Sequence, residues 1–146
     1  MPTLYSYRKH QDTLISRELR FPEDPKTGER LGTELATVDG VTYVSLPDGA
    51  VLPVDQPKEI AASIAAVTPT AALKTAIADA SPHVALVRER TRAKIREKFS
   101  LEDEVGLLRS KLRAPATANP AFDAYDTFAE SARAWAAAEK TRLGLG

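Results

Sequence analysis

Glu102, Asp103 and Glu104 are consecutive acidic residues that could form a metal site or an acid/base cluster. Three successive residues of a helix point in different directions, so they are poorly placed to share one metal ion. The segment Ser100-Leu101-Glu102-Asp103 resembles a capping box with Asp in place of the usual Glu. Negative charge in a first helical turn is also what the helix dipole favours. We therefore expect capping, with a metal site as the alternative.

The other residues capable of chemistry form no catalytic pattern. His10 and His83 are far apart in sequence and fit neither a metal-ligand nor a triad spacing, although folding could bring them together. The chain has no cysteine, which removes disulfides, thiolate zinc sites and cysteine nucleophiles. It also has no phosphate loop of the GxGxxG or GxxxxGKS/T type. The sequence predicts no enzyme, no catalytic or metal-binding residue and no cofactor.

Basic residues occupy every second position from Arg88 to Lys98: Arg88, Arg90, Arg92, Lys94, Arg96 and Lys98. On a helix this spacing spreads charge around the cylinder, so no flat basic face is formed for phosphates. The whole chain has 20 basic and 20 acidic residues, and bulk charge therefore does not steer it toward nucleic acid or an anionic membrane. We expect a solvated helix; contact with nucleic acid or with an acidic partner is the alternative.

Helices with clear start and stop signals follow from Ser81 onward. Ser81 suits an N-cap and Pro82 a first helical position, and a narrow apolar stripe comes next: Val84, Val87, Thr91 and Ile95. A bend near Phe99-Ser100 separates it from a second stripe: Leu101, Val105, Leu108 and Leu112. Asn119 and Pro120 open a last helix that ends before Gly144 and carries four large aromatic residues: Phe122, Tyr125, Phe128 and Trp135. The short connection 114–118 predicts that the last two helices are antiparallel neighbours.

The first half of the chain predicts a small sheet. Segments 34–38 and 41–46 flank Asp39-Gly40, the pair that most readily forms a type I′ hairpin turn. The turn signal at 47–49 lets residues 50–52 return as a third strand, which gives a meander.

The segments on either side of this sheet are harder to interpret. Residues 1–32 show no clear period, and we expect either an extended docking arm or a strand or short helix that completes its own domain. Residues 57–67 predict a short helix with Ile60, Ile64 and Val67 on one face, followed by a second helix with Leu73 and Ile77.

Together these elements predict a mainly α fold with a small antiparallel β meander (α+β), a C-terminal helical hairpin and an N-terminal extended or irregular arm. Residues 1–55 form the arm and meander and residues 56–146 the helical region, expected as one folding unit because 146 residues support one core. No secretory signal is visible, which predicts a cytoplasmic site of synthesis. No apolar stretch approaches the roughly 20 residues of a membrane helix, so no membrane contact is expected.

The segment Lys94 to Arg109, KIREKFSLEDEVGLLR, resembles the C-terminal helical region of small tail proteins from tailed bacteriophages. In that region an R-x-K-Y-S-x-E-D-E-x-x-L-x-R pattern precedes a helix with a spaced F-x-x-Y and a late Trp. Here these residues are Phe122, Tyr125 and Trp135, and Phe99 replaces the more usual Tyr. The hairpin at 38–43 and the turn at 47–49 are also similar to those of tail-fibre and baseplate accessory proteins. The resemblance covers about a third of the chain.

The resemblance implies a virion structural protein of the tail tip or baseplate, made in the host cytoplasm, that links the tail to fibres or receptor-binding proteins. Its partners would be other tail or fibre proteins and copies of itself, with no nucleic acid. Aromatic and aliphatic residues supply much of the energy of such contacts. The candidate interface residues, for which packing in the chain's own core is the alternative, are Phe122, Tyr125, Phe128, Trp135, Val84, Val87 and Ile95.

Three other functions remain open from the sequence. The first is an assembly chaperone that holds a tail fibre during folding and is absent from the finished particle. The second is a small nucleic-acid-binding regulator that uses the 88–98 helix, whose affinity for DNA would fall steeply with salt. The third is an enzyme, because side chains distant in sequence can converge in space.

Overall fold

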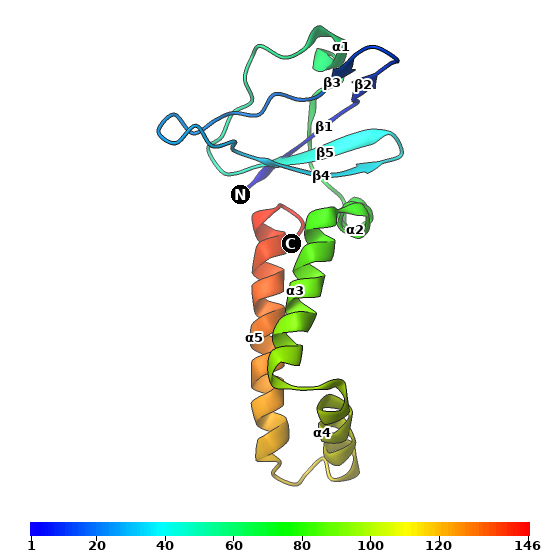
Figure 1. The fold of residues 1–146 in the computed structure, drawn as a ribbon, viewed down its shortest axis with the longest axis vertical. Coiled ribbons are helices and arrows are strands. Elements are labelled where there is room, and N and C mark those ends of the chain that lie inside the picture. The colour runs from blue at the N-terminus through cyan, green and yellow to red at the C-terminus, as the bar shows by residue number, and fades with distance from the viewer. The chain divides into compact units, whose positions relative to one another are not determined.

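Strands occupy the first half of the chain and long helices the second half in the computed structural model, which describes residues 1–146 (Figure 1). The strands are β1 (Thr3–Tyr7), β2 (His10–Gln11), β3 (Ser16–Arg17), β4 (Thr33–Val38), β5 (Val41–Leu46) and β6 (Ala65–Val67). The helices are α1 (Lys58–Ala61), α2 (Ala71–Ala80), α3 (Pro82–Lys98), α4 (Leu101–Arg113) and α5 (Pro120–Arg142). The α+β class predicted from the sequence is confirmed.

The β4–β5 hairpin around Asp39-Gly40 is confirmed. Both turn residues have positive φ angles, 51° for Asp39 and 76° for Gly40, as a type I′ turn requires. The turn sets the register, with Val38 opposite Val41. A bulge between Glu34 and Ala36 shifts the pairing further along β4, and Leu35 and Ala36 are both buried although they are adjacent in sequence.

The third strand predicted at residues 50–52 is wrong. The turn at Pro47 forms, because the amide of Ala50 donates to the carbonyl of Pro47 at 3.1 Å, but the residues after it join no strand. The free side of β5 is taken by β1, and the four-stranded antiparallel sheet has the order β4-β5-β1-β6. Of the two readings of the N-terminal segment, the structure shows the strand that completes its own domain.

The sheet is covered on both faces. Leu4 and Tyr7 of β1 point to opposite faces and belong to two different core clusters. One cluster joins the sheet to α2, the start of α3 and the C-terminal residues; its buried members are Leu4, Leu35, Ala36, Ile77, Val84, Leu143 and Leu145. The other joins the opposite face to α1 and the irregular segments; its buried members are Tyr7, Leu19, Val44 and Ile60. Burial on both faces removes the alternation that usually identifies a strand in a sequence.

The helix predicted over residues 57–67 is wrong beyond its first turn. Ser63 stops it, because its hydroxyl donates to the carbonyl of Ile60 at 2.7 Å and accepts from the amide of Arg8 at 3.0 Å. The next residues form β6, which pairs antiparallel with β1. Pairing with the sheet therefore overrides the helix propensity of this alanine-rich segment.

Most of the remaining helix boundaries follow the predicted signals. Asn119 caps α5 through the amide of Phe122 at 3.1 Å, as predicted, whereas α2 is capped through the amide of Leu73 by the Thr70 hydroxyl, which the sequence did not single out. The capping box of α4 is complete, with reciprocal bonds between Ser100 and Asp103 at 3.1 and 3.0 Å. Gly144 ends α5 in a Schellman motif, in which the amides of Gly144 and Leu145 donate to the carbonyls of Thr141 and Lys140.

The chain divides into two compact units. Unit 1 contains residues 1–85 and 140–146, and unit 2 contains residues 86–139. The sequence placed the boundary after residue 55, but three later parts of the chain belong to unit 1. These are β6, α2 with the start of α3, and the C-terminal residues that follow α5, and each contributes to the sheet or its core. Composition could not reveal this boundary, because it falls within α3, where no turn or linker marks it.

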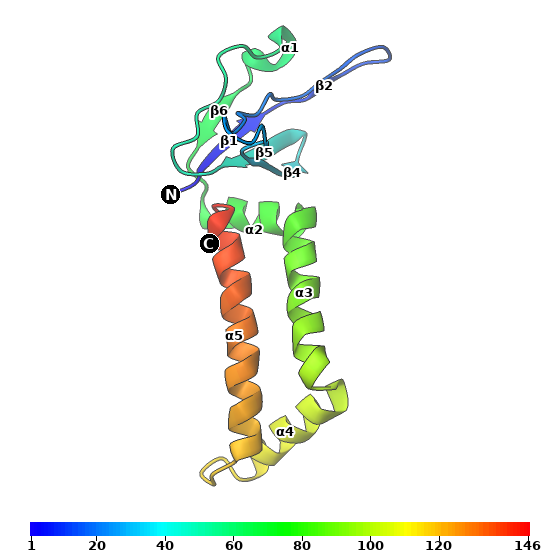
Figure 2. The ribbon, with the colours of Figure 1, turned by 60° about the vertical axis from the view of Figure 1, so that its left-hand side comes forward.

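Unit 2 is built from α4 and the adjoining parts of α3 and α5. The helix that runs beside α5 in the opposite direction is α3, and α4 crosses obliquely from the end of α3 toward the start of α5 (Figure 2). The prediction that the last two helices are antiparallel is therefore wrong, although α4 and α5 are neighbours as predicted. The bend at Phe99-Ser100, which the sequence did predict, turns the chain into this crossing.

Gly144 and Gly49 form a matched pair for testing how the C-terminal turn is packed. Both have left-handed φ angles, but a methyl group at 144 would lie 2.3 Å from Cδ1 of Leu4, whereas nothing lies within 4 Å of one at 49. We expect Gly49→Ala to lower the free energy of unfolding by about 1 kcal/mol through backbone strain. We expect Gly144→Ala to lower it by roughly 2–4 kcal/mol, because Leu4 is buried and cannot move aside freely. Urea denaturation followed by far-UV circular dichroism measures both losses, and equal losses would contradict the close approach of Leu4.

Candidate protein-contact surface

An aromatic cluster holds the corner between α3 and α4 against α5. Phe99 lies at the corner, and its ring meets that of Tyr125 edge to face at 5.3 Å and 84°. The Phe99 ring also lies 5.9 Å from Phe128, and Phe122 lies 6.2 Å from Tyr125. These separations are within the range at which aromatic rings attract one another. The cluster fixes where α4 begins relative to α5.

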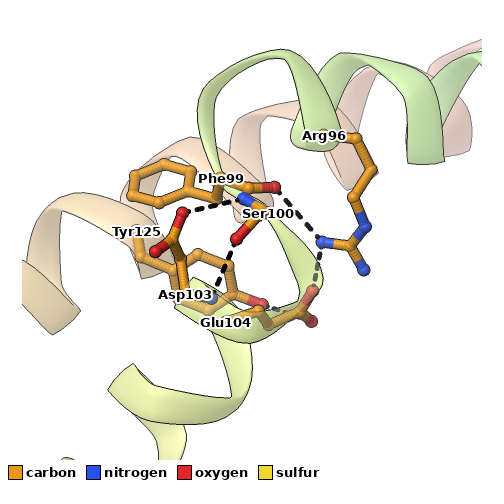
Figure 3. Close-up of polar contacts among 6 residues, drawn as sticks. All are labelled: Arg96, Phe99, Ser100, Asp103, Glu104 and Tyr125. Carbon is orange, nitrogen blue, oxygen red and sulfur yellow. Dashed lines mark hydrogen bonds and ion pairs between the residues drawn. The ribbon is translucent and has the colours of Figure 1, made fainter.

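A polar contact fixes the rotation of α4 about its own axis (Figure 3). The Tyr125 hydroxyl donates to Oε1 of Glu104 at 2.7 Å, and the guanidinium of Arg96 pairs with the other carboxylate oxygen. Arg96 therefore connects α3 to α4, and Tyr125 connects α5 to α4. The hydrogen bond from Tyr125, and then the bond from Arg96, hold the pKa of Glu104 below its ordinary value. Burial, followed by the nearby Glu104 carboxylate, raises the pKa of Tyr125.

This contact selects which side of α4 faces α5. Glu104, Leu107 and Lys111 lie on that side and are the half-buried residues of the helix. The Lys111 ammonium lies 5.6 Å from the centre of the Phe122 ring, and Ser110 nearby accepts a hydrogen bond from Asn119 at 3.2 Å. Two of the three inward residues are charged, so α4 makes much of its contact with α5 through polar groups.

The apolar side of α4 is consequently turned to solvent. We call it the contact stripe, and it consists of Leu101, Val105, Leu108 and Leu112, which are 59%, 40%, 41% and 80% exposed. No residue of α4 is buried. The spacing of four, three and four residues is that of the a and d positions of a coiled coil. A single exposed leucine is ordinary, but four aligned apolar side chains form a continuous seam.

The flank of the contact stripe that faces away from α5 carries charges in a fixed order. Glu102 lies near the N-terminal end of α4, and Arg109 and Arg113 lie toward the C-terminal end, all exposed to solvent. None of them forms an ion pair within the chain. These charges are free to meet a partner.

Three of the seven candidate interface residues are buried inside the chain. Val84, Val87 and Tyr125 are buried, which leaves them almost no surface to offer a partner. The other four, Phe122, Phe128, Trp135 and Ile95, are half-buried, and their role as an interface stays a prediction. Trp135 lines a hollow of about 400 Å³ with residues of α3, and Lys98 lies 4.8 Å from the centre of the Phe128 ring.

The sequence predicted that the four residues of the contact stripe share one helical face, but it did not predict that this face is exposed. A helical pattern shows which residues share a face, not whether that face is covered. The missing signal is the neighbouring side of the helix, which carries Glu104, Leu107 and Lys111. That side is half-buried only because Tyr125 and Phe122 from α5 meet it.

The groups considered for chemistry stay apart. Asp103 is occupied in the capping box and Glu104 in its contact with Tyr125 and Arg96, and no group of three or more His, Cys, Asp or Glu residues could hold a metal ion. His10 lies 3.5 Å from Asp12 in the β2–β3 hairpin, whereas His83 lines a groove beside β4. None of the helices has the length and apolarity needed to cross a membrane.

The basic residues from Arg88 to Lys98 are all exposed, and at alternate positions they point around α3. Two of them have partners in unit 2, since Arg96 pairs with Glu104 and Lys98 lies over the Phe128 ring. The arrangement forms no single basic face.

The Glu104 contact makes stability depend on pH in a definite direction. A carboxylate whose folded pKa is depressed contributes fully above its unfolded pKa, and the contribution is lost as the pH falls through the folded pKa. We expect Glu104→Gln to lower the free energy of unfolding by about 1 kcal/mol at pH 7. The difference from the unaltered chain should narrow below about pH 4. Denaturant titrations at several pH values test this, with Glu102→Gln, in the same helical turn, as the control that changes little. A difference in the free energy of unfolding that does not change with pH would contradict a stabilising role for the ionised Glu104 carboxylate.

Comparison with known proteins assigns no family to this arrangement. No family model matches the chain, and neither a curated protein nor a solved structure is significantly similar to it. The surface of α4 and the contacts that orient it are therefore the basis on which function is inferred.

Proposed function

We propose that this chain is a structural component of a bacteriophage tail tip or baseplate that acts through protein contacts and links the tail to fibres or receptor-binding proteins. It is not an enzyme and uses no cofactor in this proposal. The observation that carries it is the contact stripe, which is apolar, aligned and uncovered.

The energetics of the contact stripe favour a protein partner. Fully burying one leucine or valine side chain contributes about 1.5–3 kcal/mol relative to leaving it in water. At these four positions of one short helix, between two-fifths and four-fifths of the side-chain surface stays exposed, and that part of the contribution is not realised within the chain. A partner that covers the stripe recovers part of it, and apolar anchors at the centre of an interface supply most of the binding energy.

The resemblance to phage tail proteins involves the residues that orient α4. Arg96, Phe99, Ser100, Asp103 and Glu104 all lie within the segment that carries it, and they form the corner, the capping box and the polar contact. Phe122 and Tyr125, the spaced aromatic pair of the resemblance, complete the same cluster. These residues fix the position and rotation of α4, which supports a contact role for the whole region.

The composition of purified virions tests the proposed function. Quantitative mass spectrometry of the phage whose genome encodes this chain should detect it in the tail at a fixed ratio to a baseplate protein. Its absence from virions, together with co-purification with an unassembled fibre from infected cells, would overturn the structural role in favour of an assembly chaperone. Its absence from virions and from fibre complexes alike would overturn the structural role and the chaperone role.

Substitution in the contact stripe should remove the chain from the particle. We expect Leu108→Asp to lower the amount in virions at least tenfold, because a charge in a desolvated apolar contact costs several kcal/mol. Leu86→Asp is the matched control, since Leu86 on α3 is 43% exposed and Leu108 is 41% exposed. Circular dichroism of both purified variants should match that of the unaltered chain. Normal incorporation of Leu108→Asp would show that the stripe is not the surface used.

A further inference from the structure

The partner surface of the contact stripe can be specified further, on the basis of the proposed contact function. We propose that the contact stripe packs against the contact stripe of a second copy of this chain, antiparallel and about a two-fold axis. The geometry and charge order of α4 carry this inference.

The apolar spacing is self-complementary when one copy of α4 is reversed. Leu101 of one copy lies opposite Leu112 of the other, and Val105 lies opposite Leu108. The spacing of four, three and four residues reads the same in both directions, so each side chain meets an apolar partner. An isologous contact requires this property, because both copies present the same patch.

The charges on the outer flank select the antiparallel orientation. A two-fold axis perpendicular to the helices brings the same flank of both copies together. The level of Glu102 in one copy then falls between Arg109 and Arg113 of the other, so opposite charges meet at both ends of the contact. In a parallel arrangement about a two-fold axis, the outer flank of one copy would lie beside the inner flank of the other, so Glu102 would meet neither Arg109 nor Arg113. Charged residues beside an apolar seam set its orientation in this way.

The inner flank supports the same orientation. Glu104 and Lys111 also place negative charge early and positive charge late in α4, in the same order as the outer flank. Both are already engaged with α5, by the Tyr125 hydroxyl and the Phe122 ring. The proposed pairing leaves those contacts in place.

The size of the contact predicts weak association in isolation. A helix of 13 residues is only about 20 Å long, and two such helices bury far less than the roughly 1,200 Å² of a standard stable interface. The dimer should therefore form at about 10 μM to 1 mM protein, and it would be reinforced where neighbouring subunits hold two copies together.

Single cysteines test the orientation cleanly, because the chain contains no cysteine. We expect Leu101→Cys mixed with Leu112→Cys to give a disulfide-linked dimer after mild oxidation, visible on a non-reducing gel. Each variant alone should stay uncrosslinked, since its two cysteines would lie about 16 Å apart along the axis, beyond the roughly 7 Å Cα limit. Efficient crosslinking of each variant alone, without preference for the mixture, would overturn the antiparallel arrangement.

Charge variants test the same contact without a covalent bond. In sedimentation equilibrium we expect Glu102→Arg to weaken self-association at least about tenfold. Exchanging all three flank charges, by Glu102→Arg with Arg109→Glu and Arg113→Glu, should restore it. Under a parallel arrangement Glu102→Arg would not weaken association, because Glu102 would meet neither arginine of the other copy. Leu86→Asp should retain the unaltered association.

The outcomes separate this inference from the proposed function. A chain that stays monomeric at about 1 mM and forms no mixed disulfide, yet is still lost from virions when Leu108 is replaced by Asp, refutes self-pairing and keeps the tail role. A chain that dimerises as described but is absent from virions keeps self-pairing and refutes the tail role.

Discussion

The hydrogen bond from the Tyr125 hydroxyl to Glu104 is the contact on which the exposed surface of unit 2 depends. A helix can be rotated about its axis at little cost unless a specific contact fixes it. Here the buried Tyr125 ring, packed edge to face on Phe99, fixes the position of the hydroxyl, and the hydroxyl fixes Glu104. With Glu104, Leu107 and Lys111 held inward, the contact stripe lies about a quarter turn further round α4, where it meets solvent. Exposure of the contact stripe is thus a consequence of a polar contact elsewhere on the same helix.

The helices were predictable because their boundaries are local. Ser100, Asn119 and Gly144 each act within one turn of their own position, by hydrogen bonds to neighbouring amides or by a left-handed angle. The β4–β5 hairpin was predictable for the same reason, since Asp39-Gly40 fixes its own turn. None of these features needs information from distant parts of the chain.

The sheet was only half predictable because its remaining strands depend on distant partners. Leu4 and Tyr7 serve opposite faces, so β1 shows no alternation, and β6 is an alanine-rich segment that becomes a strand only beside β1. The candidate site shows the same division. The spacing of the contact stripe could be predicted from the sequence, but its exposure could not. The exposure depends on the contact between Glu104 and Tyr125, which lies on a different helix. The aromatic residues drew the interface prediction instead, since large rings serve a core and an interface equally well.

The connectivity of the two units explains how the chain can carry an exposed apolar helix and still fold. Unit 2 begins within α3 and returns within α5, and both ends of this excursion belong to unit 1. Val84 enters the core of unit 1 before the excursion, and Leu143 and Leu145 enter it afterwards, positioned by the turn at Gly144. The core therefore depends on no residue of α4. The residues that stabilise the core of unit 1 and those that form the contact stripe are therefore separate. Substitutions in the stripe should alter association with a partner before they alter folding.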